Sequence, residues 1–106
     1  TYGSLAGGIL SGKYKDPAKF GKADARSFFY TYYAGDAFGK VQKLLQHLVA
    51  LGRPLNQAAL NWARQQPGVT SVLVGCRNAR QARDNALAAE WDLTGEQLAA
   101  IRQYLP

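Results

Sequence analysis

The sequence predicts a helix-rich α/β fold. Four stretches place apolar residues at helical spacing, and one short β-branched run, residues 69–74, lies between the second and the third of them. A run of this kind between helices is typical of a buried parallel strand. The 106 residues are 47% hydrophobic and 19% charged, which is the composition of a globular chain. One strand cannot form a sheet, so the edges of 69–74 need partner strands.

Residues 1–36 are expected to form loops. Three glycines between Leu5 and Lys13 allow the backbone to approach a bound molecule closely. Residues 16–36 indicate a long loop that carries basic residues and the aromatic run 28–33. Loops of this length in compact domains are usually functional. We interpret the aromatic run as a lid or packing segment, and stacking on single-stranded nucleic acid is the alternative.

Two helices are predicted within residues 37–67. The first has apolar residues on a 3.6-residue period, namely Phe38, Val41, Leu44, Leu45, Leu48 and Leu51. Gly52 is a C-terminal stop signal for this helix, and Pro54 opens the second one. Pro67 and Gly68 end the second helix, before the predicted last strand over 69–75.

Residues 78–106 are predicted to be helical. Asn78 with Gln81 forms a capping pair for a third helix over about 80–89. Thr94 with Gln97 repeats this pair for a fourth helix. We expect a surface or packing role for the single histidine, His47, because no acid–base partner accompanies it in the sequence.

The net charge of +6 is concentrated in residues 13–26 and 77–83, and such basic clusters attract phosphate. The single cysteine, Cys76, excludes an internal disulfide and favours a reducing, cytoplasmic location and a packing role. The sequence shows no bilayer-spanning run, signal peptide, metal-ligand cluster or nucleic-acid fold signature. We therefore expect neither a membrane, a metal nor a nucleic acid as partner.

The segment 72–85 is the strongest functional motif. A strand runs into Gly75, then into Arg77, the N-cap residue Asn78 and a helix, and helix N-termini bind anions through free N–H groups. Arg77, Gln81 and Asn85 recur every four residues and share one face. A guanidinium and two amides suit a phosphate beside a heterocycle. A solvated polar turn is the alternative explanation of this segment alone.

Two regions resemble one known family. Residues 2–14, Tyr-Gly-Ser-Leu-Ala-Gly-Gly-Ile-Leu-Ser-Gly-Lys-Tyr, resemble the segment after the seventh strand of aldo-keto reductases. Residues 59–62 and 67–75 resemble a helix and the eighth strand that follows it in the same family, and residues 76–85 and 91–94 continue the match. The resemblance implies the C-terminal part of a (β/α)8 TIM barrel, with NADPH bound at the C-terminal mouth and aldehydes or ketones reduced to alcohols. The chain would then be part of a longer polypeptide and an incomplete barrel.

The resemblance also implies roles for residues at the adenosine end of NADP. Arg77, Gln81 and Asn85 match positions that hold the 2′-phosphate and the adenine. Asp84 matches an acidic or polar position near the adenine amine, and Gly75 matches the glycine that admits the ribose. The charge of Arg77 favours NADP over NAD.

At the other end of the cofactor, the resemblance implies a loop that wraps the pyrophosphate, formed by Leu5, Gly7, Gly8 and Lys13. Tyr2 matches the aromatic residue that stacks on the nicotinamide, and Arg26 matches a basic clamp from the long loop. Gly3-Ser4-Leu5 departs from the Ser-Pro-Leu of the family, which lowers the rank of Ser4 as a ligand.

The family's catalytic tyrosine, lysine, aspartate and histidine come from the first half of the barrel, which this chain lacks. We therefore expect no catalytic residue here and no carbonyl reduction by the chain alone. The small carbonyl substrate belongs to the full-length protein, and the sequence does not define it. The alternative function is a self-standing interaction module, which would form a homo-oligomer by sharing its exposed strand edge.

Overall fold

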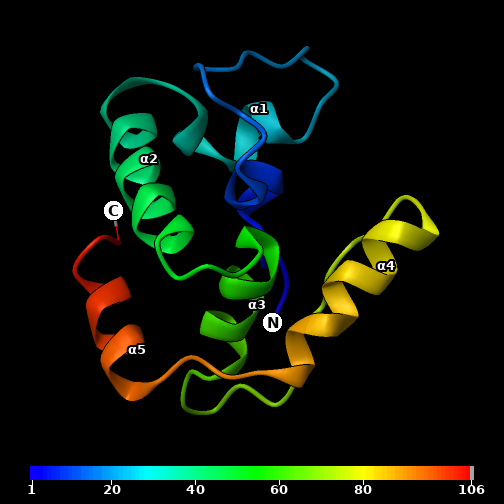
Figure 1. Cartoon of the computed structure of the whole chain (residues 1–106). Coiled ribbons are helices and arrows are strands. Elements are labelled where there is room, and N and C mark those ends of the chain that lie inside the picture. Colours follow the sequence, from blue (N-terminus) through cyan, green and yellow to red (C-terminus); the bar gives the residue numbers. More distant parts are fainter. Residues whose placement is uncertain (106) are drawn as a thin grey trace.

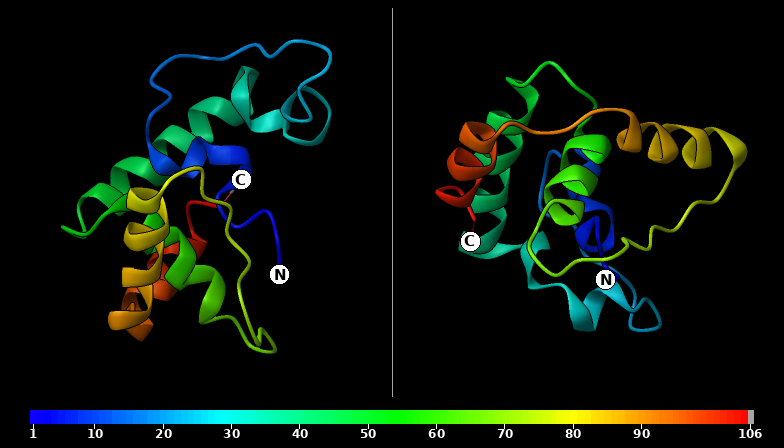
Figure 2. Two further views of the ribbon diagram at one scale, coloured as in Figure 1. Left: turned by 90° about the vertical axis from the view of Figure 1, so that its right-hand side faces the viewer. Right: turned by 90° about the horizontal axis from the view of Figure 1, so that it is seen from below.

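The computed structural model describes residues 1–105, and helices packed around α2 dominate it (Figure 1). The elements in chain order are η1 Ala6–Ser11, α1 Arg26–Phe29, η2 Thr31–Tyr33, α2 Gly35–Val49, α3 Leu55–Arg64, α4 Ala79–Ala86, η3 Leu87–Glu90 and α5 Gly95–Arg102. Figures 1 and 2 show α5 beside α2, whereas α4 projects on the other side of α3. Across residues 1–105, no helix combines the length and apolar content that crossing a membrane requires.

The apolar face of α2 organises two hydrophobic clusters. The first joins α2 to the N-terminal segments and contains Ile9, Tyr33, Phe38, Val41 and Leu45. The second joins α2 to α3 and to the C-terminal region and contains Leu44, Leu48, Ala58, Leu93 and Ile101. Burying each large apolar side chain contributes about 1.5–3 kcal/mol to folding. The predicted period is therefore confirmed from Phe38 to Leu48, whereas Leu51 lies beyond the end of α2 and packs half-buried against the second cluster. The first cluster anchors the glycine-rich segment η1.

Both predicted caps form, but in different ways. At α5 the Thr94 N–H donates to Gln97 Oε1 at 2.9 Å, and the Gln97 N–H donates to Thr94 Oγ1 at 3.2 Å, which completes a capping box. At α4 the Gln81 N–H donates to Asn78 Oδ1 at 2.9 Å. The Gln81 side chain instead accepts from the Arg77 N–H at 2.8 Å, one residue before the cap.

Two helix boundaries differ from the prediction. Helix α2 begins at Gly35, inside the segment predicted as loop, and Asp36 in its first turn suits the positive end of the helix dipole. The third predicted helix is divided into α4, which ends at Ala86, and the short 3₁₀ turn η3.

The strand predicted over 69–75 is not formed in this chain: within residues 1–105 no residue is assigned to a strand. Val69 and Val72 are half-buried, whereas Leu73 and Val74 are 65% and 36% exposed. A buried strand needs neighbours on its edges, and here Thr1 takes that place beside Ser71 and Leu73. The Thr1 α-amino group donates to Ser71 O, and the Leu73 N–H donates to Thr1 O, both at 2.8 Å. This alternation matches one step of a parallel ladder.

The aromatic run 28–33 is partly a packing segment. Tyr33 is buried, and its ring makes edge contacts with Tyr14 at 5.0 Å and Phe20 at 4.6 Å between centroids. Phe28 and Phe29 are exposed, at 70% and 77%. The packing interpretation is confirmed for Tyr33 alone of these three residues, and the long loop also contains α1 and η2.

The packing role expected for His47 is confirmed, because its ring stacks on Tyr104 at 4.6 Å between centroids. The packing role expected for Cys76 is wrong, because this cysteine is exposed. Its exposure follows from the missing strand, since a residue at the end of 69–75 is covered only when the sheet is present.

Candidate functional site

A cleft of about 740 Å³ opens between the glycine-rich segment η1 and the start of α4. Its lining includes every residue predicted for the site except one, namely Leu5, Gly7, Gly8, Lys13, Arg26, Gly75, Arg77, Gln81, Asp84 and Asn85. The exception is Tyr2, which is 87% exposed and lies outside the lining. The fold thus brings together two segments that are about seventy residues apart in the chain.

The glycine-rich wall of the cleft depends on backbone conformations that favour glycine. Gly7 has φ 68° and Gly8 has φ 104°. A Cβ on Gly7 would lie 2.8 Å from the Tyr30 ring, which is closer than real contacts allow. The Tyr33 hydroxyl donates to Gly7 O at 2.8 Å and holds this turn from the core side. The two tyrosines therefore determine the path of the loop.

The ionisation of Tyr33 provides a pH-dependent test of its hydrogen bond to Gly7 O. Burial, followed by the neighbouring Tyr14, raises the pKa of Tyr33 to about 12. The folded state thus retains the proton more tightly than the unfolded state. The contribution of the neutral hydroxyl to stability is complete below about pH 10 and is lost as the pH rises toward 12.

We expect Tyr33→Phe to lower the free energy of unfolding by about 1 kcal/mol at pH 8, because the bond to Gly7 O is lost. The difference from the wild type should shrink as the pH rises from 10 to 12. Urea unfolding across this range measures it. Tyr32→Phe is the control, because the Tyr32 hydroxyl makes no hydrogen bond within residues 1–105. A cost equal to that of the control at every pH would contradict the role.

Arg26 is held in place by several partners. Its guanidinium pairs with Asp24 at 2.6 Å, donates to the Tyr14 hydroxyl at 2.8 Å, and lies 4.0 Å above the centre of the Phe20 ring. Hydrogen bonding from Arg26 is the largest cause that lowers the pKa of Asp24 to about 2. The Asp24 carboxylate in turn raises the pKa of Arg26 above its usual value. The clamp residue predicted in the loop is therefore ordered.

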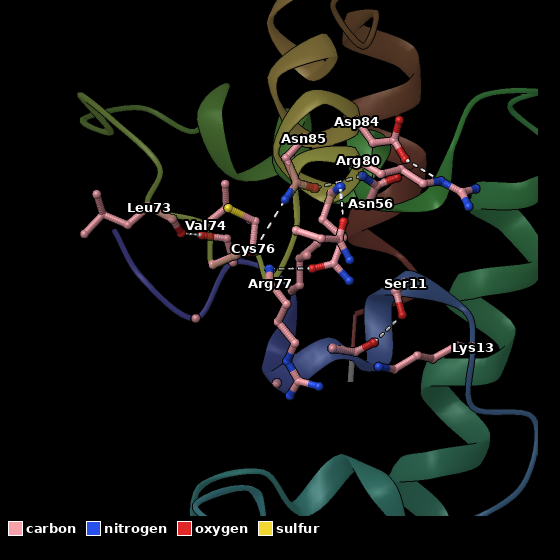
Figure 3. A pocket seen from close by; sticks show the side chains of 18 of the residues that line it. Ser11, Lys13, Asn56, Leu73, Val74, Cys76, Arg77, Arg80, Asp84 and Asn85 are labelled. Carbon is pink, nitrogen blue, oxygen red and sulfur yellow. Dashed lines mark hydrogen bonds and ion pairs between the residues drawn. The ribbon is translucent and has the colours of Figure 1, made fainter.

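The other cations of the cleft differ in their pairing. Arg80 lies 3.8 Å from the carboxylate of Asp84, one helical turn away. Within the described part of the chain, no carboxylate forms an ion pair with Arg77 or Lys13. In Figure 3 the Arg77 and Lys13 side chains both extend toward the glycine-rich segment, and Arg80 extends the opposite way. Two available cations in one cleft favour an anionic ligand, and phosphate above all.

Sequence reasoning missed some residues of the cleft, among them Ser11, Tyr30, Asn56 and Arg80. Arg80 lies within the basic cluster and could have been chosen on charge alone. Asn56 comes from α3, which the apolar pattern marked only as a packing helix, so its contact with the cleft carries no sequence signal. Ser4 also lines the cleft, but its hydroxyl donates to Leu73 O at 2.8 Å, in agreement with its low rank as a ligand.

The model of the Aldo/keto reductase family matches residues 1–106, the whole chain. The chain belongs to the aldo/keto reductase family. The family resemblance of residues 2–14 and 59–85 is therefore confirmed. Aldo/keto reductases are TIM barrels and generally use nicotinamide cofactors.

Individual aldo/keto reductases and related proteins match at similar identity. Aldo-keto reductase str7 of Strobilurus tenacellus is 31% identical over 107 residues, which cover 97% of this chain and 32% of that protein. Aflatoxin B1 aldehyde reductase member 4 of Homo sapiens is 31% identical over 108 residues, covering 85% and 33%. A probable voltage-gated potassium channel subunit beta of Arabidopsis thaliana is 30% identical over 95 residues, covering 85% and 29%. The chain thus spans about a third of the length of these relatives.

Proposed function

We propose that this chain forms the NADP-binding C-terminal part of an aldo/keto reductase barrel. The carrying observation is the cleft itself, which gathers the predicted ligands and leaves Arg77 and Lys13 without carboxylate partners in the described residues. In this proposal, residues 1–36 are the cofactor loop and lid, 37–67 and 78–106 contribute helices, and 69–75 becomes the last strand once its neighbours pair with it.

The residues of the cleft suit the two ends of the cofactor. We assign the adenosine 2′-phosphate to Arg77 and the adenine region to Gln81, Asp84 and Asn85. A Cβ on Gly75 would meet no atom within 4 Å, so the ribose has open space there. The pyrophosphate region is assigned to Leu5, Gly7, Gly8 and Lys13, with Arg26 as the ordered clamp. Stacking of Tyr2 on the nicotinamide stays a prediction, because Tyr2 is exposed and does not line the cleft.

The proposed parent reaction is NADPH-dependent reduction of an aldehyde or ketone to an alcohol. When bound, the cofactor supplies the hydride. The contribution of this chain is to bind the cofactor, to orient it through the glycine-rich turn, and to match its negative charge. The residues that protonate the carbonyl oxygen are proposed to lie in the part of the barrel outside these 106 residues.

Titration of the protein with NADP and with NAD tests the assignment of Arg77. We expect Arg77→Ala to weaken NADP binding about 10- to 100-fold, because one charge-assisted contact contributes about 1.5–3 kcal/mol. NAD binding should change little, since NAD lacks the 2′-phosphate. Isothermal calorimetry or quenching of tryptophan fluorescence measures both affinities.

The matched control is Arg83→Ala, which removes an arginine of α4 that does not line the cleft, whereas Arg77 lies just before the N-cap of this helix. It should leave the ratio of the two affinities unchanged. An equal loss of NADP and NAD affinity in Arg77→Ala would contradict the 2′-phosphate role, and failure of the wild type to bind either dinucleotide would contradict the proposed function.

A further inference from the structure

Asn56 connects two helices at the edge of the cleft. It lies in the first turn of α3, and its Nδ2 donates to Asn85 Oδ1, in the last turn of α4, at 2.9 Å. Both side chains are half-buried, and both line the cleft. Helix α4 buries none of its side chains, so it has little apolar packing to orient them. Polar contacts such as this one therefore matter more for α4 than for α2.

The neighbouring backbone determines which way the two amides point. Asn85 Nδ2 faces Gly75 O at 3.5 Å. A carbonyl oxygen can only accept, so the nitrogen end of the Asn85 amide must face Gly75. The oxygen end then faces Asn56, which must present its own nitrogen. Figure 3 shows the Asn85 and Asn56 side chains next to each other, joined by the dashed line of this hydrogen bond. The order of donors and acceptors is thus set by one fixed carbonyl.

The contact with Asn56 has a consequence for binding. It uses one of the two lone pairs of the Asn85 amide oxygen, and the contact with Gly75 O uses one of the two N–H groups of the amide nitrogen. The second N–H of the Asn85 amide therefore remains available. A side chain held in this way offers a donor to the cleft, which an acceptor on the ligand can meet.

We infer that Asn56 is a positioning residue, which holds the Asn85 amide with its nitrogen toward the cleft and so selects a base that presents a hydrogen-bond acceptor. This role rests on the proposed function, because the base is that of the bound dinucleotide. Asn56 itself need not touch the ligand. Without it, the Asn85 amide is free to rotate, and its nitrogen is no longer held in place.

Comparing NADP binding by Asn56→Leu and by the wild-type protein tests the inference. Leucine has a similar size and a higher helix propensity, so α3 should not be weakened, while the donor is lost. We expect NADP affinity to fall about three- to tenfold, the range of one net hydrogen bond. Asn56→Ala is the second variant, and its unfolding curve together with that of Asn56→Leu verifies folding.

A double-mutant cycle with Asn85→Ala separates positioning from a general structural role. If Asn56 acts through Asn85, the double variant Asn56→Leu/Asn85→Ala binds NADP as tightly as Asn85→Ala alone. Additive losses, or unchanged affinity in both Asn56 variants, would overturn the inference. Failure of the proposed function is distinguishable, since the wild type itself would then not bind NADP.

Discussion

Replacing Leu48 with alanine is expected to lower the free energy of unfolding by about 2–5 kcal/mol. Leu48 is 2% exposed and belongs to the cluster that joins α2 to α3 and to the C-terminal region. The loss has two parts, the transfer free energy of the deleted atoms and the cavity that remains. Alanine is a good helix former, so α2 itself is not weakened, and the effect reports packing between helices.

Val49→Ala is the control for Leu48→Ala. Val49 is the next residue of α2 and is 60% exposed, so its replacement should change the free energy of unfolding by less than about 0.5 kcal/mol. Urea unfolding followed by far-ultraviolet circular dichroism measures both variants. Equal effects of the two substitutions would show that α2 does not bury this face as described.

Replacing Asn61 with leucine is expected to cost about 2–3 kcal/mol through polar groups rather than volume. Asn61 is fully buried; its Nδ2 donates to Trp91 O at 2.9 Å and its Oδ1 accepts from Arg64 Nη2 at 2.8 Å. The bond to Trp91 O ties α3 to the segment before α5, and the bond from Arg64 lies within α3. Leucine fills a similar space but can neither donate nor accept. Trp91 O and the charged Arg64 guanidinium would each lose one hydrogen bond.

Thermal unfolding measures the effect of Asn61→Leu, and we expect Tm to fall by roughly 10 °C. Gln46→Leu is the control, because it makes a similar exchange of amide for apolar side chain on the exposed side of α2. An Asn61→Leu protein as stable as the wild type would indicate that packing, rather than the hydrogen bonds, sets the α3 contact.

The helices could be predicted from the sequence because their signals are local. The apolar period of α2 and the Thr94–Gln97 cap each depend on residues within a few positions of one another. The strand over 69–75 could not be verified in the same way. A strand is stable only when other strands pair with it, and the β-branched run carries no information about whether those partners are present.

The candidate site was predictable only in part. Residues 2–14 and 76–85 carry family motifs, and all site residues predicted there except Tyr2 line one cleft. Asn56 was missed because its contact with Asn85 joins two helices that are separate in the sequence. The sequence could not predict that Tyr33 is buried and Phe28 exposed, because both lie in the same aromatic run.

The absence of buried side chains in α4 links the occupancy of the cleft to the order of this helix. A helix attached mainly by polar contacts opens at a low free energy. A molecule that binds only when α4 is in place stabilises that state, relative to the state in which α4 is detached, by its own binding free energy. Asn85 would then serve both as a ligand and, through its hydrogen bond with Asn56, as an attachment of α4 to α3. Slowed amide hydrogen exchange in α4 would thus be a direct gauge of how much of the cleft is filled.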